Sequence, residues 1–281
     1  MRHRTFATID DRIPVVGQGS WYFEKADRDA AIRAIHEGID AGATHIDTAE
    51  MYGSGQVEEI VGEAIEGRRS DLFIVSKVLP GNASRRGTVE ACERSLDRLG
   101  TETLDCYLLH WPGSYPLEQT FEAFEELREK GRVRSWGVSN FDERDLARAV
   151  EVAGEGKIAC NQVLYHLKQR AIEHEVLPFC REHGIPIVAY SPFGSDDFPD
   201  PGSGEGAVLR QIADELDATP HQVALAFLLR HDDLFVIPRS TDPEHARQNA
   251  EAGSLELDED QIARIDEAFP RGEWSGGVPV L

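Results

Sequence analysis

Short apolar segments alternate with amphipathic helical segments along the whole 281-residue chain. In the helical segments apolar residues recur at steps of three and four, as at Val89, Cys92 and Leu96, which is the spacing of one helix face. Repeated strand–helix alternation predicts a parallel sheet covered by helices. The segments expected to be strands are residues 15–18, 43–47, 72–77, 104–109, 133–138, 158–162, 187–190 and 234–238.

Eight strand–helix units in a chain of this length favour a closed barrel. The expected helices lie around 32–39, 57–65, 89–99, 121–127, 146–150, 172–183 and 207–216, with an extra helix over 219–229 and two more that begin after 242 and 258. Thr219 with Gln222, and Asp258 with Gln261, have the spacing of capping boxes. We therefore predict an α/β fold, a single (β/α)8 TIM barrel over residues 1–281 with extra C-terminal helices.

A doubly wound open sheet is the alternative fold. A sheet of that kind that binds a dinucleotide usually carries a G-x-G-x-x-G motif after its first strand. Here Gly17, Gln18 and Gly19 are followed by Ser-Trp-Tyr, so the motif is missing. The barrel remains the favoured prediction.

Acidic residues dominate the charge, with 51 Asp and Glu against 29 Lys and Arg and a formal net charge of −22. Such a surface repels nucleic acid and anionic membranes, so neither is expected as a partner. Only five of the basic residues are lysines, and an acidic, lysine-poor surface indicates adaptation to a salty cytoplasm, where ions screen the self-repulsion. No apolar run approaches the roughly 20 residues of a membrane span, and the start of the chain lacks the apolar region of a secretory signal. We expect a cytoplasmic protein.

The four cysteines, Cys92, Cys106, Cys160 and Cys180, are far apart and form no CxxC pair. A disulfide framework or a zinc site would need closer groups. We therefore expect free thiols, most of them buried, and no bound metal. Free thiols agree with a reducing cytoplasm.

Polar residues follow the expected strands at their carboxyl ends, which is where barrel enzymes place their active sites. These residues are Asp47 and Tyr52, Lys77, His110, Ser139 and Asn140, Asn161 and Gln162, Tyr190 and Ser191, and Arg239 and Ser240. A single polar residue at a strand end usually marks only the point where the strand meets solvent. The whole set is harder to explain in that way, because four titratable groups of complementary type would meet at the same end of the barrel.

Tyr52, Lys77, Asp47 and His110 together suggest delivery of a proton. A tyrosine is ordinarily a weak acid with a pKa of roughly 10. A lysine ammonium beside the hydroxyl lowers that pKa, and an aspartate keeps the lysine charged and in place. A histidine can donate a hydrogen bond to a carbonyl oxygen. A hydride would have to come from a cofactor, because no side chain supplies one.

Eight motifs distributed over the whole chain carry a resemblance to a known family. They are IPVVGQGSW at 13–21, HIDTAEMYGSG at 45–55, VSKV at 75–78, LLHWP at 108–112, WGVSNF at 136–141, NQVLYH at 161–166, AYSPFG at 189–194 and VIPRST at 236–241. In these motifs the sequence resembles the aldo-keto reductase family, especially prokaryotic members of the methylglyoxal-reductase and diketogulonate-reductase kind. The resemblance implies NAD(P)H-dependent reduction of small aldehydes and ketones by a monomer, with Tyr52 as general acid.

The resemblance also implies roles for individual residues. Asp47, Tyr52, Lys77 and His110 would form a catalytic tetrad. Binding of the nicotinamide end would fall to Ser20, Trp21, Asp47, Ser139, Asn140, Gln162 and Tyr190, with the Tyr190 ring stacked on the nicotinamide. Ser191 and its loop would pass along the pyrophosphate. The substrate would contact Trp21, Tyr52, His110 and Trp111.

The expected adenosine-phosphate clamp departs from the family pattern. NADPH-using members carry Lys-Ser here, with an arginine six residues after that lysine, whereas this chain has Arg239 and His245 at the two charged positions. The other clamp residues would be Ser240, Thr241, Gln248 and Asn249. Arg239 is a strong bidentate phosphate ligand, so NADPH is the expected cofactor, with NADH left open.

Two other functions remain open at this point. One is a non-catalytic nucleotide-sensing subunit of the same fold, and the other is a Schiff-base aldolase that uses Lys77 as nucleophile. The short C-terminal segment at 272–281 lacks the long substrate-closing loop of larger family members. We therefore expect an open pocket that accepts a broad range of aldehydes.

Overall fold

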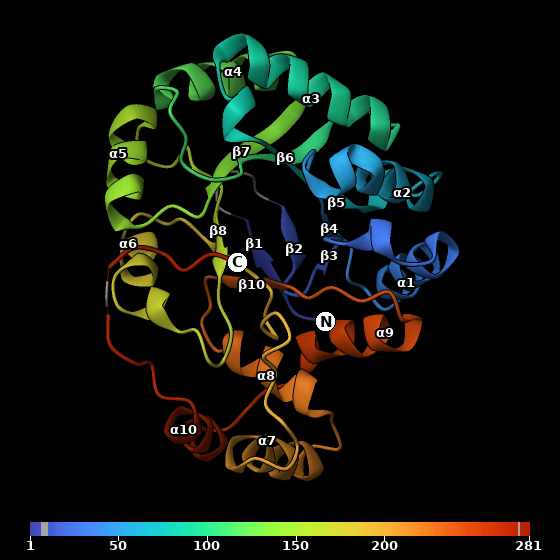
Figure 1. Cartoon of the computed structure of the whole chain (residues 1–281), viewed down its shortest axis with the longest axis vertical. Helices are drawn as coiled ribbons and strands as arrows, with labels where there is room; N and C mark the ends of the chain where they lie inside the picture. The colour runs from blue at the N-terminus through green and yellow to red at the C-terminus, as the bar shows by residue number, and fades with distance from the viewer. Residues whose placement is uncertain (7–10, 275) are drawn as a thin grey trace.

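Eight parallel strands form the centre of the computed structural model, which describes residues 1–6, 11–274 and 276–281 (Figure 1). Each strand pairs with the next one along the chain. The strands are β3 (Gln18–Gly19), β4 (His45–Asp47), β5 (Phe73–Val78), β6 (Leu104–Leu109), β7 (Val133–Ser139), β8 (Asn161–Leu164), β9 (Ile187–Tyr190) and β10 (Leu234–Ile237).

The first and last strands of this sheet meet and close the barrel. Val16 and Gly19 form parallel bridges to Val236 and Arg239, and the Gly17 amide donates to the Val236 carbonyl at 2.8 Å. A Cβ atom at Gly19 would lie 2.8 Å from a backbone oxygen of β10, so only glycine allows this approach. The predicted (β/α)8 barrel is confirmed.

Ten α-helices surround the barrel or extend it within the described parts of the chain (Figure 1). They are α1 (Arg28–Asp40), α2 (Gln56–Ala64), α3 (Arg85–Leu99), α4 (Leu117–Glu129), α5 (Glu143–Ala153), α6 (Val176–Glu182), α7 (Gly204–Glu215), α8 (Pro220–Leu228), α9 (Pro243–Glu251) and α10 (Glu259–Ala268). The capping boxes at Thr219 and Asp258 are both formed. None of the helices in the described ranges combines the length and apolar character needed to cross a bilayer.

Several predicted boundaries were wrong. The first strand was expected over 15–18 but is β3 at Gln18–Gly19. Strand β8 begins at Asn161 rather than at 158, so Asn161 and Gln162 open the strand instead of ending it. Their register opposite Val138 and Ser139 still places them level with the end of β7, because the strands of a barrel are staggered. The helix expected over 172–183 is a short 3-10 turn followed by α6, and α7 begins earlier than expected because Ser203 caps it.

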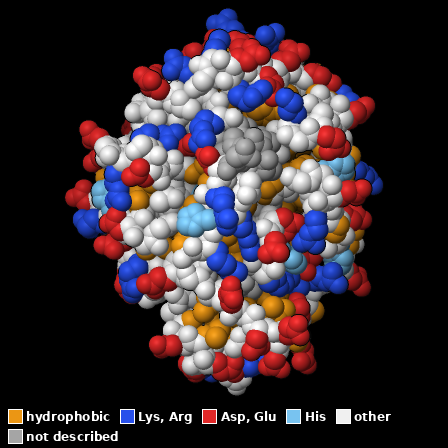
Figure 2. All heavy atoms as spheres, turned by 180° about the vertical axis from the view of Figure 1, so that it is seen from behind, with side chains coloured by type: hydrophobic (Ala, Val, Ile, Leu, Met, Phe, Trp, Pro, Cys, Tyr) orange, Lys and Arg blue, Asp and Glu red, His pale blue; other side chains and the backbone are white. Residues whose placement is uncertain are grey.

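An N-terminal hairpin, β1 (His3–Thr5) paired with β2 (Arg12–Pro14), was not predicted. Phe6 packs edge-on against Phe73 and Phe235, with ring centroids 5.1 and 5.5 Å apart, and joins the apolar cluster inside the barrel. The hairpin lies behind the strands in Figure 1. Figure 2 shows the molecule from that side, where acidic side chains are numerous around the periphery and basic ones gather nearer the middle.

The core has an inner part within the barrel and an outer part between the strands and the helices. Cys106 and Cys160 belong to the inner part, and Cys92 and Cys180 to the outer part. All four thiols are free and buried, as predicted.

Candidate active site

The buried ammonium group of Lys77 is the centre of the predicted tetrad. Its Nζ atom, on β5, donates to Asp47 Oδ1 at 2.5 Å and to the Thr48 carbonyl at 2.8 Å. The third contact is to Tyr52 Oη at 3.3 Å. An ammonium group has three donors, so all of them have acceptors and Lys77 is held as a cation.

A sharp turn after β4 places Tyr52 above the lysine. Gly53, Ser54 and Gly55 all have left-handed backbones, with φ values of 55°, 54° and 97°. A left-handed serine is uncommon, and such strained positions concentrate at functional sites. The turn leads directly into α2 and leaves the Tyr52 hydroxyl against Lys77.

His110 follows β6 and faces the same cavity. Its ring lies edge-on to that of Tyr52, with centroids 5.8 Å apart. Burial, together with the positive charge of Lys77, lowers the pKa of His110 to about 2. The imidazole is therefore neutral at physiological pH and can donate from one ring nitrogen.

The net pKa shift of Tyr52 is opposite to the expectation. Burial raises the pKa of the hydroxyl above its usual 10, while the Lys77 ammonium acts in the lowering direction that was predicted. Burial lowers the pKa of Lys77, but Asp47 and Tyr52 more than offset this, and the net shift is upward. Tyr52 thus keeps its proton at neutral pH, and Lys77 keeps its charge.

A cavity of about 480 Å³ lies over the tetrad. Its lining includes the predicted residues Trp21, Tyr52, His110, Trp111, Ser139, Asn140, Gln162 and Tyr190. It also includes Met51, Pro112, Val278, Val280 and Leu281, which were not predicted. Figure 1 shows the end of the C-terminal tail over the middle of the barrel. The short tail thus forms part of the cavity wall. The expected open pocket had no wall from the C-terminal segment.

A second cavity of about 270 Å³ adjoins the first and shares Trp21, Tyr52 and Tyr190 with it. The other predicted residues along it are Ser20, Asp47, Ser191 and Arg239. Residues not predicted here are Gly19, Tyr22, Pro192, Phe193, Gly194, Ser195, Asp196 and Ile237. Together the two cavities form an elongated recess that runs from the tetrad toward β10.

Hydrogen bonds hold the amide side chains between these cavities in place. Gln162 Nε2 donates to Asp47 Oδ2 at 2.7 Å, which links β8 to the tetrad. Tyr190 Oη donates to Asn140 Oδ1 at 2.9 Å, and Ser139 Oγ donates to the Gln162 carbonyl at 2.8 Å. The polar groups expected to hold a nicotinamide carboxamide are thus brought together.

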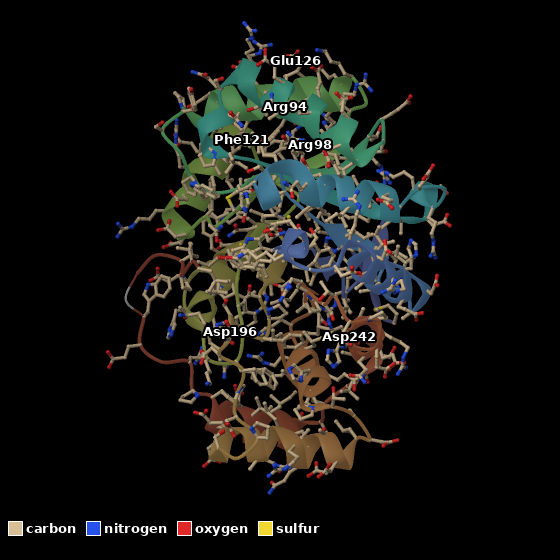
Figure 3. The ribbon with its side chains drawn as sticks, turned by 45° about the vertical axis from the view of Figure 1, so that its right-hand side comes forward. Arg94, Arg98, Phe121, Glu126, Asp196 and Asp242 are labelled. Carbon is tan, nitrogen blue, oxygen red and sulfur yellow. The ribbon has the colours of Figure 1, made fainter. Side chains whose placement is uncertain are left out.

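The structure brings only part of the predicted phosphate clamp to the recess. Arg239 lines the second cavity, whereas neither cavity includes Ser240, Thr241, His245, Gln248 or Asn249. These five residues lie on the loop and helix that follow Arg239. Asp242 caps α9 by accepting from the His245 amide at 3.0 Å. Figure 3 shows Asp242 at this helix start and Asp196 on the loop after β9.

Sequence reasoning missed residues for two different reasons. Tyr22 stacks on Trp21 with ring centroids 4.3 Å apart. Because Tyr22 directly follows Trp21, which was predicted, its position in the sequence already indicated a place at the site. Asp196 lies just beyond the AYSPFG motif and could have been found in the same way. No motif or spacing connects Val278 and Val280 with the tetrad, so nothing in the sequence signals their place.

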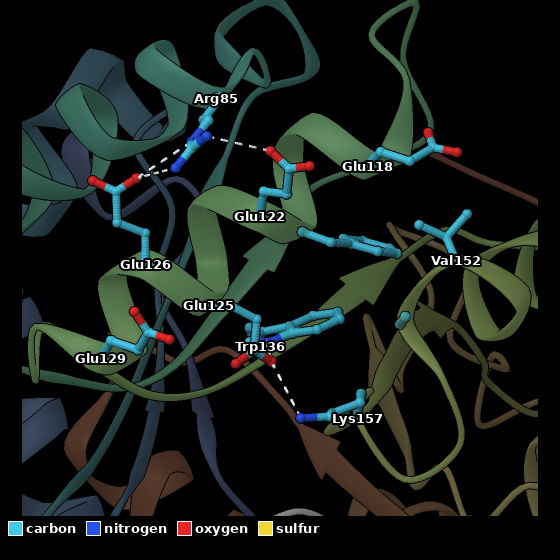
Figure 4. Close-up of a pocket in the computed structure, with 11 residues that line it drawn as sticks. Arg85, Glu118, Glu122, Glu125, Glu126, Glu129, Trp136, Val152 and Lys157 are labelled. Carbon is cyan, nitrogen blue, oxygen red and sulfur yellow. Dashed lines mark hydrogen bonds and ion pairs between the residues drawn. The ribbon is translucent and has the colours of Figure 1, made fainter.

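A larger groove of about 680 Å³ lies on the outside of the barrel along α4 (Figure 4). Three of its five lining carboxylates have partners within the groove, because Glu122 and Glu126 pair with Arg85 and Glu125 accepts from the Trp136 indole. None of the predicted site residues lines it. The groove is therefore a solvated surface feature and not a candidate active site.

The closed barrel, and the Asp–Tyr–Lys–His group at its strand ends beside an elongated recess, define an enzyme of the oxidoreductase class. Residues 15–269 match the model of the aldo/keto reductase family. The chain is 42% identical to methylglyoxal reductase YeaE of Escherichia coli (strain K12), over 93% of each chain. It is 34% identical to glyoxal reductase of Bacillus subtilis (strain 168), over 95% of this chain and 92% of that one. This protein belongs to the aldo/keto reductase family.

Its structure is also similar to a solved member of the family. An aldo-keto reductase from Klebsiella pneumoniae in complex with NADPH superposes with a TM-score of 0.93 at 38% identity, and the match covers 100% of both chains. The family resemblance inferred from the eight motifs is confirmed.

Proposed function

We propose that this enzyme reduces aldehydes and ketones to alcohols with NADPH, with Tyr52 as the proton donor. The observation that carries the proposal is the contact of one buried ammonium group, on Lys77, with both Asp47 and Tyr52 beneath the cavity. The residues along the recess would hold a nicotinamide cofactor, which would supply the hydride for the carbonyl carbon. Tyr52 supplies the proton that the carbonyl oxygen needs, so the product is a neutral alcohol.

The residues around Tyr52 support this proton transfer. When the hydroxyl gives up its proton, the Lys77 ammonium stabilises the phenolate that remains. Asp47 balances the lysine charge and fixes its position. Neutral His110, which lies beside Tyr52, would donate a hydrogen bond to the carbonyl oxygen and so orient it toward Tyr52.

The recess suits an elongated dinucleotide. The Tyr190 ring, held by its hydrogen bond to Asn140, would lie against the nicotinamide, with the amides of Asn140 and Gln162 beside its carboxamide. Arg239 is the one Lys or Arg among the residues that line the second cavity, and it would pair with a phosphate. The NADPH found in the Klebsiella relative supports the same choice of cofactor.

The two alternative functions have less support. A nucleotide-sensing subunit has no need of a tetrad arranged for proton transfer. A Schiff-base aldolase needs Lys77 as a neutral amine, whereas all three of its donors have acceptors and its pKa is raised.

The activity should favour uncharged aldehydes with an apolar body. The exposed large hydrophobic residues among those described are Trp111, Tyr115, Val280 and Leu281, and three of the four line the cavity. No lysine or arginine is among its lining residues. We expect 4-methylbenzaldehyde to have a kcat/KM at least about tenfold above that of 4-carboxybenzaldehyde, because an unpaired buried polar group costs roughly 1–3 kcal/mol or more.

The measurement is NADPH oxidation followed at 340 nm with both aldehydes and with methylglyoxal, at low and high salt. Equal kcat/KM values for the methyl and carboxy compounds would refute the substrate preference alone. A lack of NADPH oxidation with every carbonyl under all conditions would refute the proposed function itself.

Arg239 should determine the preference for NADPH. Its side chain is exposed, and no carboxylate among the described residues lies within ion-pair distance of it. In Arg239→Ala the Kd of NADPH should rise about ten- to 150-fold, the range for a lost hydrogen bond to a charged group at roughly 1.5–3 kcal/mol. The Kd of NADH, which lacks the phosphate, should change little.

Arg247→Ala is the matched control, because Arg247 lies on α9 but pairs with Glu244 and Glu251 away from the recess. Titration of each cofactor at two ionic strengths checks the prediction, since salt should weaken only the phosphate contact. His245→Arg should strengthen NADPH binding selectively. Equal losses for NADPH and NADH in Arg239→Ala would show that Arg239 does not recognise the phosphate.

A further inference from the structure

The segment that carries Tyr52 has a buried carboxylate on each side. Glu50 is 7% exposed and Glu58 is 0% exposed. Burial of a carboxylate is unfavourable unless it is paired and hydrogen-bonded. Neither residue is part of the tetrad, so their burial needs another explanation.

Both carboxylates join the Tyr52 segment to the strand of Lys77. Glu58 accepts from Ser76 Oγ at 2.6 Å, and Ser76 directly precedes Lys77 on β5. Glu50 accepts from the Leu79 amide at 2.7 Å, two residues after Lys77. The lysine thus lies between two points, one on β5 and one just after it, at which these carboxylates tie the tyrosine segment to the chain.

Two arginines on α3 complete the connection. Arg98 Nη1 donates to the second oxygen of Glu58 at 2.8 Å, and Arg94 lies 3.5 Å from Glu50. Arg94 and Arg98 are four residues apart, so they project from the same face of the helix. Figure 3 shows both on α3.

Arg98 also contacts the turn that holds Tyr52. A Cβ atom at Gly55 would lie 2.6 Å from Arg98 Cζ, so the guanidinium packs directly on the backbone of the left-handed turn. A side chain at this position would force the guanidinium to shift, and the left-handed backbone, with φ of 97°, would itself be strained. Arg98 therefore touches the tyrosine turn and, through Glu58, the lysine strand.

We propose that Glu58 and Arg98 are positioning residues that set the separation between the Tyr52 hydroxyl and the Lys77 ammonium, with Glu50 and Arg94 supporting the other end of the segment. The inference rests on the proposed function, in which that separation controls proton transfer. Ser76 and Lys77 are neighbours on one strand, so their side chains point to opposite faces. A shift of Ser76 consequently moves the lysine inside the barrel.

The test uses the whole enzyme with NADPH and a neutral aldehyde. Arg98→Met keeps the aliphatic stem and removes the guanidinium, and we expect kcat to fall about ten- to hundredfold, as small displacements of catalytic groups do. The KM for NADPH should stay within about twofold, because these residues lie outside the recess. Arg98→Lys should recover part of the loss. Arg86→Met is the control, because Arg86 lies on α3 but pairs with Glu90 at the surface.

Two further readouts separate positioning from a general loss of folded enzyme. The solvent deuterium isotope effect on kcat should rise in Arg98→Met, whereas a smaller folded fraction would leave it unchanged. In a Tyr52→Phe background, Arg98→Met should cause no additional loss, because the residue it positions is gone. If Arg98→Met does not fold, Glu58→Gln provides the same comparison with less change in volume.

The outcomes also distinguish this inference from the function on which it rests. A full loss in Tyr52→Phe with a normal kcat in both Arg98→Met and Glu58→Gln would overturn the positioning role alone. Multiplicative losses of activity in the double variant with Tyr52→Phe and Arg98→Met would also overturn the positioning role. Normal activity in Tyr52→Phe would instead refute the proton-donor assignment.

Discussion

Replacement of Tyr52 by phenylalanine should lower kcat for carbonyl reduction by about 10²–10⁴-fold, the contribution usual for general acid catalysis. The change removes only the hydroxyl, which contacts Lys77 Nζ at 3.3 Å. Lys77 keeps its ion pair with Asp47 and its bond to the Thr48 carbonyl. The ring still fills its place beside His110, so the fold and NADPH binding should be retained.

The measurement compares kcat with the Kd of NADPH and the melting temperature. Tyr115→Phe is the control, because Tyr115 is an exposed tyrosine beyond the cavity lining, and its activity should equal that of the wild type. Turnover in Tyr52→Phe within a few-fold of the wild type would exclude Tyr52 as the proton donor.

Replacement of Lys77 by methionine should reduce activity as much as the tyrosine variant does. The two residues act as one unit, since the ammonium stabilises the phenolate that the proton transfer leaves behind. The double variant should therefore be no slower than the slower single variant. Strictly multiplicative losses would contradict this coupling.

The lysine variant should also lower the free energy of unfolding. Without Lys77, the bond from Gln162 is the one that the buried Asp47 side chain keeps among the described residues. Breaking a buried ion pair costs about 3–5 kcal/mol. Adding Asp47→Asn removes the unpaired charge and should restore most of the stability without restoring activity. Denaturant unfolding of Lys77→Met and of the double variant with Asp47→Asn measures their stability. NADPH oxidation by the same two variants measures their activity. Recovery of activity together with stability would show that Lys77 has only a structural role.

The tetrad could be inferred from the sequence because its members lie at, or within a few residues after, the carboxyl ends of strands. Parallel strands in a barrel bring their carboxyl ends to one mouth, so Asp47, Lys77 and His110 had to lie near one another. Arg239 was found in the same way, after β10. The N-terminal hairpin was not found, because strands of three residues are too short to establish a periodicity.

The net pKa shift of Tyr52 could not be predicted from residue types. The expectation considered only the charge of Lys77, whereas the depth at which the hydroxyl lies decides the net direction. Burial is a property of everything packed around a group, and it includes residues far away in the chain.

The sequence by itself determined the elements that depend on local interactions. Helix periodicity, the capping boxes at Thr219 and Asp258, and the polar residues at strand ends all arise within a few neighbouring residues, and the barrel follows from the repeated alternation. Only the tertiary structure decided which distant groups meet. Gln162 bonds to Asp47 across 115 positions, Arg98 reaches Glu58 across 40, and the tail residue Val280 lines the cavity of His110. These contacts depend on the stagger of the strands and on side-chain packing, which no local pattern encodes.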